Sequence, residues 1–106
     1  MLKTPRFYNE KYRRWVASLP CITCKIEGRT QCAHIRHQNG GGIGMKPEDK
    51  HCVPLCITCH QAQGERGEVR FWADRLNKAK ETALKLFCIR EESDRDISAR
   101  QLIEEF

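Results

Sequence analysis

The chain has 106 residues, a length that suits one domain with a modest core. Its net charge is +5, but residues 1–87 carry 16 Lys and Arg against 8 Asp and Glu, whereas residues 88–106 carry 3 against 6. A basic body suits a polyanionic partner, and the acidic end indicates a separate interaction element. No apolar run is long enough to span a bilayer and no secretory signal opens the chain, so we expect a cytoplasmic protein without a membrane partner.

The first predicted element is a helix over residues 9–18. Asn9 is a suitable N-cap, and Pro20 marks the end of the helix. Between them, apolar side chains recur at helical spacing: Tyr12, Trp15, Val16 and Leu19. We expect this amphipathic helix to pack on the core.

Two strands are predicted, over residues 30–36 and 51–55. Pro54 limits the second strand to an edge position. Between the strands, residues 38–44 hold four of the seven glycines, and residues 46–49 indicate a turn.

The rest of the chain is predicted to be helical. The pattern turns helical after Cys59, and residues 68–87 predict a long amphipathic helix. Its apolar stripe consists of Val69, Trp72, Leu76, Ala79, Ala83, Leu84 and Phe87. A last short helix is predicted over residues 97–105, with four apolar residues available for docking on the body or on a partner: Ile97, Leu102, Ile103 and Phe106.

The tetrapeptide Cys-Ile-Thr-Cys occurs twice, at residues 21–24 and 56–59. Zinc prefers four ligands in a tetrahedron, and a turn with two residues between cysteines aims both thiolates at one ion. Two such turns fill the coordination shell, so Cys21, Cys24, Cys56 and Cys59 predict a structural zinc site. The alternative is a redox dithiol, which needs a βαβ setting. Two Cys-x2-Cys pairs in a chain this short fit that setting poorly.

Two histidines would be brought together by this zinc site. His34 lies on the first predicted strand, and His60 directly follows the last zinc ligand, pointing about 100° away from Cys59 on a helix. Histidine suits the activation of water because its pKa lies near neutral pH. A divalent metal suits the neutralisation of the charge on a phosphate. Arg36 shares the face of His34 and is a candidate for gripping that phosphate, with a surface salt bridge as the alternative.

The motifs together resemble the HNH endonuclease family. The resemblance rests on Cys21-x2-Cys24, on Ala33-His34-Ile35-Arg36, on the glycine-rich loop ending in Lys46-Pro47-Glu48-Asp49, and on Val53-Pro54-Leu55-Cys56-x2-Cys59-His60. It covers residues 12–72 and is strongest with the small Ala-His-Ile-Arg type of phages and prophages, akin to the recombination-enhancement nucleases. A bacterial or phage-infected cell is the setting that this resemblance implies.

The resemblance implies an α+β fold, with a ββα-metal core and a four-cysteine structural zinc flanked by N-terminal and C-terminal helices. It implies hydrolysis of DNA phosphodiester bonds with a catalytic divalent metal such as Mg, Mn, Ni or Zn. His34 then matches the general base, His60 a ligand of the catalytic metal, and His51 the position that orients the base. The glycine-rich loop and Lys46 are expected to contact the DNA backbone, with a plain connection as the alternative.

The chain departs from the family pattern at two positions. Ala33 and Gly64 stand where many members carry a further metal ligand. Four residues are candidates to supply the missing ligands: Cys32, His37, His51 and Glu65. The two departures favour one alternative, a non-catalytic zinc-ribbon module that binds nucleic acid or protein. A redox or metal-sensing protein is the other alternative.

In terms of domains, we expect an HNH-like domain over residues 1–90, with its core at 12–72. Residues 91–106 are expected to form an acidic helical appendage that offers a surface to a protein partner, in addition to the DNA partner of the basic body.

Overall fold

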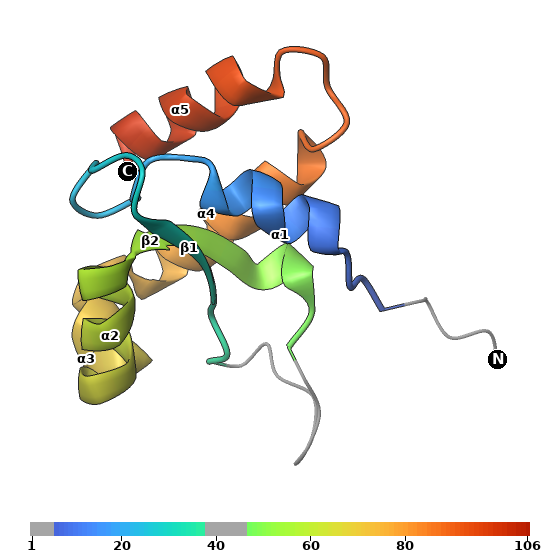
Figure 1. The fold of residues 1–106 in the computed structure, drawn as a ribbon. Coiled ribbons are helices and arrows are strands. Elements are labelled where there is room, and N and C mark those ends of the chain that lie inside the picture. The colour runs from blue at the N-terminus through green and yellow to red at the C-terminus, as the bar shows by residue number, and fades with distance from the viewer. Residues whose placement is uncertain (1–5, 38–46) are drawn as a thin grey trace, which may run out of the picture.

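A computed structural model describes residues 6–37 and 47–106 of the chain. They form an α+β fold in which helices surround one two-stranded sheet (Figure 1). The elements are α1 (Glu10–Ala17), β1 (Thr30–His34), the 3₁₀ turn η1 (Asp49–His51), β2 (Cys52–Cys56), α2 (Ile57–Arg66), α3 (Glu68–Trp72), the 3₁₀ turn η2 (Ala73–Arg75), α4 (Leu76–Cys88) and α5 (Arg95–Glu105). The predicted α+β class is confirmed at this level. Within the two described ranges, no helix has the length and apolar character needed to cross a bilayer.

Helix α1 forms where the sequence predicts it. The side chain of Asn9 accepts a hydrogen bond from the backbone N–H of Tyr12 at 2.8 Å, which satisfies one of the free donors of the first turn. Tyr12, Trp15 and Val16 are buried on one face of the helix. The helix ends at Ala17, three residues before Pro20, as the proline requires.

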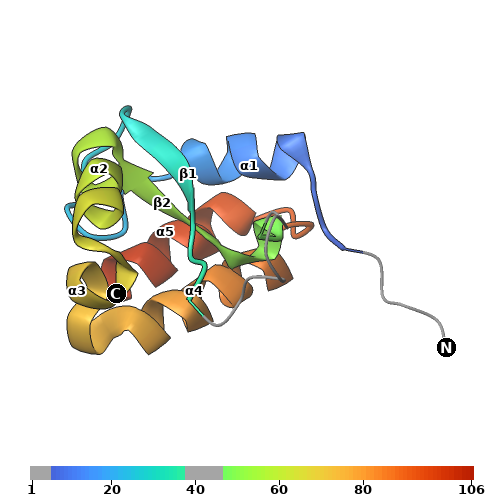
Figure 2. The same ribbon diagram turned by 90° about the horizontal axis from the view of Figure 1, so that it is seen from below.

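The two strands pair antiparallel, with Ala33 opposite Val53 and His34 opposite Cys52. Every residue of β2 is buried, whereas β1 buries only Ala33. Helices α1 and α2 pack against both strands and α4 packs against β2, so the hairpin lies between α1 and α4 (Figure 2). The hairpin therefore forms the centre of the fold.

Strand β1 ends at His34, two residues before the end that the sequence predicts. The backbone N–H of Ile35 still donates to the carbonyl of His51, and beyond it the N–H groups of Arg36 and His37 donate to the carboxylate of Glu68 on α3. Glu68 therefore ties the end of the strand to α3. The glycine-rich stretch 38–44 and Lys46 lie outside the described residues, so their expected contact with DNA stays a prediction.

The predicted helix over residues 68–87 is wrong in one respect, because the structure divides it into α3 and α4. The break lies at Ala73, whose φ of +52° is incompatible with a continuous helix. Trp72 is buried and its indole N–H donates to Gln63 of α2 at 2.7 Å, so α3 packs back on α2 and the chain must turn before α4 can follow the hairpin. Two residues of the predicted apolar stripe, Val69 and Leu84, are exposed.

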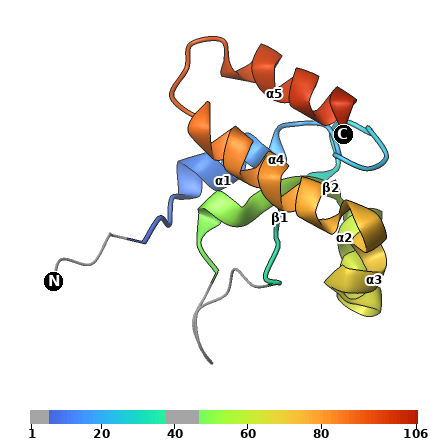
Figure 3. The same ribbon diagram turned by 180° about the vertical axis from the view of Figure 1, so that it is seen from behind.

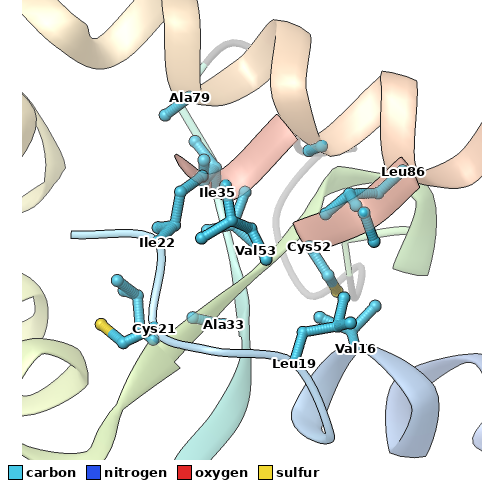
Figure 4. Close-up of a cluster of buried hydrophobic side chains, with 14 of the residues drawn as sticks. Val16, Leu19, Cys21, Ile22, Ala33, Ile35, Cys52, Val53, Ala79 and Leu86 are labelled. Atoms are coloured by element: carbon cyan, nitrogen blue, oxygen red, sulfur yellow. The ribbon is translucent and has the colours of Figure 1, made fainter. Parts of the chain in front are cut away.

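The core is a single cluster to which the hairpin, α1, α4 and α5 all contribute. Figure 4 shows part of it, with Val16 of α1, Val53 of β2, and Ala79 and Leu86 of α4. Seen from behind, α4 crosses the hairpin and α5 lies beside α4 (Figure 3). The core thus joins α1 and α5 to the hairpin and α4.

Helix α5 docks on the body of the protein. Ala99 and Ile103 are buried in the common core, and the indole N–H of Trp15 donates to Asp96 at 2.6 Å. Ile97, which the sequence offers as a docking residue, is 73% exposed instead. The division into a domain over 1–90 and an appendage over 91–106 stays a prediction, and the two parts share a core.

Candidate metal centre and active site

The four cysteines of the doubled tetrapeptide meet in space. The Sγ atoms of Cys21, Cys24, Cys56 and Cys59 all lie within 4.8 Å of one another, and those of Cys24 and Cys56 are 3.5 Å apart. Four sulfurs bound to one zinc ion at about 2.3 Å form a tetrahedron with edges of about 3.8 Å. The arrangement fits a metal such as zinc, and it joins the segment before β1 to the end of β2.

The surroundings of the cluster shift the thiol pKa values in opposite directions. The hydroxyl of Thr23 donates to Cys59 Sγ at 3.1 Å, and the N–H of Cys59 donates to Cys56 Sγ at 3.4 Å. Burial raises the pKa of Cys21, but hydrogen bonds, chiefly from the backbone at Cys24, lower it to about 6. Burial raises the pKa of Cys59 to about 12. Because four adjacent thiolates repel one another, a divalent cation at their centre is what allows all of them to ionise.

His34 and His60 lie at one hollow, as the sequence predicts. This hollow of about 480 Å³ lies between β1 and α2, and we call it the α2 hollow; Cys32, His34, Arg36, His60, Gly64 and Glu68 are among its lining residues. A second hollow of about 640 Å³, the α1 hollow, is lined by Tyr8, Arg13, His34, Arg36, Pro47 and Asp49. His34 and Arg36 line both hollows and therefore stand between them.

Asp49 orients the ring of His34. Its Oδ1 lies 2.9 Å from His34 Nε2, and its Oδ2 accepts hydrogen bonds from the N–H of Asn9 at 2.7 Å and from Arg13 at 2.6 Å. Burial acts to raise the pKa of Asp49, but these hydrogen bonds outweigh it and lower the pKa. The carboxylate is therefore ionised near neutral pH and can only accept, so His34 carries its proton on Nε2 and leaves Nδ1 able to take up another.

His60 is prepared to act as a metal ligand. Its Nδ1 lies 2.8 Å from Gln31 Oε1 on β1, and an amide oxygen at that position holds the proton on Nδ1 and leaves Nε2 free. Burial, followed by the nearby His34, lowers the pKa of His60. The imidazole is therefore neutral near pH 7, which is the form that binds metals.

The structure places the other predicted site residues as follows. Arg36 is exposed at the junction of the two hollows. His51 is half-buried on η1, and its backbone carbonyl accepts the N–H of Ile35 at 2.9 Å. Among the described residues, the acceptor that the His34 ring meets is Asp49. An orienting role for the His51 side chain stays a prediction.

The candidate substitute ligands differ in whether they line the α2 hollow. Cys32 lines the α2 hollow with His34, as strand alternation predicts. His37 is half-buried and Glu65 is exposed, and neither is among the residues that line this hollow. Cys32 is thus the best placed of the set.

Sequence reasoning missed three residues that support the site. Asp49, Gln31 and Glu68 each bind a group of the site, but they lie 15, 29 and 32 residues from their partners. Asp49 stands in the motif that carries the resemblance, yet it reads as part of a polar turn. Its burial, 2% exposed, and its hydrogen bonds with His34, Asn9 and Arg13 show its role.

The fold and the site define a small α+β protein whose cysteine cluster can hold a metal beside a histidine-lined hollow. The chain belongs to the family described as "Protein of unknown function (DUF968)", which matches residues 2–84.

One curated relative is the uncharacterized protein YdfU of Escherichia coli (strain K12), which is 36% identical over 58 residues. The match covers 55% of this chain and 16% of YdfU. The chain therefore spans about a sixth of the relative that it matches. No solved structure matches the chain significantly.

Proposed function

We propose that the protein is a metal-dependent endonuclease of the HNH type that hydrolyses phosphodiester bonds in DNA. The observation that carries the proposal is the shared hollow, to which β1 contributes His34 and α2 contributes His60. The hairpin followed by a helix matches the order of a ββα-metal core, and the basic body suits a polyanionic substrate. The four-cysteine cluster holds the ends of this unit together with a structural zinc.

In the proposed reaction, His34 accepts a proton from the attacking water at Nδ1, while Asp49 holds Nε2–H and stabilises the imidazolium that forms. Arg36 lies at the same junction and offers positive charge to the scissile phosphate. His60 Nε2 is the protein atom that would hold the catalytic divalent ion. That ion supplies charge neutralisation at the phosphate and the leaving oxygen.

A supercoiled plasmid tests the proposal. We expect the zinc-loaded protein to nick it with Mg²⁺, Mn²⁺ or Ni²⁺ and to stop when a chelator removes these ions. His60→Ala should lower the rate about tenfold or more at limiting metal, with partial recovery as the metal concentration rises. Gln61→Ala, an exposed neighbour on α2, is the matched control and should behave like wild type. No nicking by fully zinc-loaded wild type with any of the three ions would contradict the proposal.

A second candidate function is a non-catalytic zinc-ribbon module that binds nucleic acid or protein. It is favoured by the two positions where family ligands are missing: the side chain of Ala33 is fully buried, and Gly64 has none. Among the described residues, His60 would then be the only metal ligand of the family pattern that remains at the α2 hollow. Such a module would bind DNA without nicking it.

The Gly64→His variant distinguishes a weakened metal site from a site without catalysis. Gly64 lines the α2 hollow four residues after His60, and a Cβ built there meets nothing within 4 Å. A second imidazole on that face should lower the metal concentration for half-maximal nicking by about tenfold or more. Gly64→Ala is the control, because it raises helix propensity without adding a ligand. Equal metal requirements in the two variants would remove position 64 from the metal site.

A further inference from the structure

A second cluster of ligating atoms lies beside the proposed active site. One ring nitrogen of His34, one carboxylate oxygen of Asp49 and Cys52 Sγ all lie within 4.8 Å of one another, and His34 Nε2 is 2.9 Å from Asp49 Oδ1. The three residues come from β1, η1 and β2, and His34 pairs directly with Cys52 across the hairpin. The hairpin register therefore sets His34 beside Cys52, and η1 brings Asp49 to them.

The donor set indicates which ions would bind. One nitrogen, one carboxylate oxygen and one sulfur suit borderline ions such as Zn²⁺ or Co²⁺ rather than Mg²⁺. Asp49 is already oriented through its other oxygen by Asn9 and Arg13. His34 lines both hollows, so an ion has a path to the cluster from solvent.

A cysteine, a histidine and an aspartate in contact also resemble the parts of a cysteine nucleophile site. Cys52 is fully buried, with 0% exposure, so a substrate carbonyl or phosphate has no access to its sulfur. A small ion held by the half-buried His34 needs no room for a substrate beside the sulfur. Metal binding is therefore the chemistry that this cluster supports.

We propose that a thiophilic divalent ion, Zn²⁺ or a close substitute, binds His34, Asp49 and Cys52 and thereby blocks the active site. The ion takes His34 Nε2, so the single proton of the neutral imidazole moves to Nδ1, and the thiol of Cys52 releases its proton to solvent. Nδ1 is the atom that accepts a proton from water in the proposed reaction, and it can no longer do so. The block rests on the proposed function, whereas the binding of the ion does not.

The two metal sites should fill in order. The four-cysteine cluster offers four thiolates, whereas the second cluster offers three mixed ligands next to the positive charge of Arg13. The four-cysteine cluster should therefore fill first, and the second cluster should respond only to ion in excess of one per chain. This order makes the second cluster a sensor of surplus metal.

Cobalt binding to the zinc-loaded protein tests the site. Protein with one zinc per chain is titrated with Co²⁺, and the sulfur-to-cobalt charge-transfer absorption in the near ultraviolet is recorded. We expect one further cobalt per chain with this band, and zinc analysis after desalting should still find one zinc. Cys52→Ala should lose the band at equal cobalt, and His34→Ala should bind Co²⁺ at least tenfold more weakly. Cys88→Ala, which removes an exposed cysteine of α4, is the control and should keep the band.

Either of two results would overturn the proposal: no cobalt–thiolate band in the wild type, or a band of equal size in Cys52→Ala. A nicking assay is run in parallel with excess Zn²⁺. There, the zinc concentration for half-inhibition should rise at least tenfold in Cys52→Ala, measured against that variant's own uninhibited rate. If the wild type nicks nothing, the proposed function fails, and the cobalt titration still decides the metal site.

Discussion

Replacing Cys56 by serine is expected to release the structural metal and unfold the protein. Cys56 ends β2, is buried, and caps α2 by accepting the N–H of Cys59. A four-cysteine zinc site contributes about 10–16 kcal/mol of binding free energy. A domain of this size is stable by only about 5–15 kcal/mol. Loss of even part of the metal's contribution therefore exceeds what the modest core can offset.

Zinc analysis and thermal melting by circular dichroism measure this effect. Wild type should hold one zinc and melt cooperatively, and a strong chelator should reproduce the loss expected for Cys56→Ser. Cys88→Ser is the matched control, because Cys88 is exposed on α4 and lies outside both clusters. A Cys56→Ser protein that melts like the wild type, or a wild type without zinc, would show that the cysteine cluster is not a structural metal site.

Replacing His34 by alanine is expected to abolish most of the nicking activity while the fold survives. Loss of a general base typically costs about 10²–10⁴-fold in rate. The fold should survive because Asp49 keeps its hydrogen bonds to Asn9 and Arg13, so no buried carboxylate is left without a partner. The zinc content should also be unchanged, since His34 is not among the residues of the four-cysteine cluster.

The matched control for His34→Ala is His37→Ala. His37 lies three residues further along the chain, and its replacement by alanine also removes one imidazole. It does not line the α2 hollow. The measurement is the rate of plasmid nicking at saturating metal, together with the melting temperature and zinc content of both variants. Equal rates in His34→Ala and the wild type would remove His34 from the role of base.

The sequence alone determined several local elements and the meeting of the four cysteines. Asn9 and Pro20 bound a helix because capping and the loss of a backbone donor act over a few residues. The paired Cys-x2-Cys turns predicted a common metal centre because ligand spacing within a turn is a local property. The approach of His34 and His60 also followed, since the two cysteine pairs bring both segments together.

Only the tertiary structure decided how the histidines are held. Asp49, which orients His34, occupies a polar turn without periodic pattern, and its burial depends on the packing of η1 against α4 and on the hydrogen bonds from Asn9 and Arg13. The break at Ala73 likewise arises because Trp72 bonds to Gln63 of α2, a contact between separate helices. Long-range hydrogen bonds and burial depend on how the elements pack, so the spacing of residues along the sequence does not predict them.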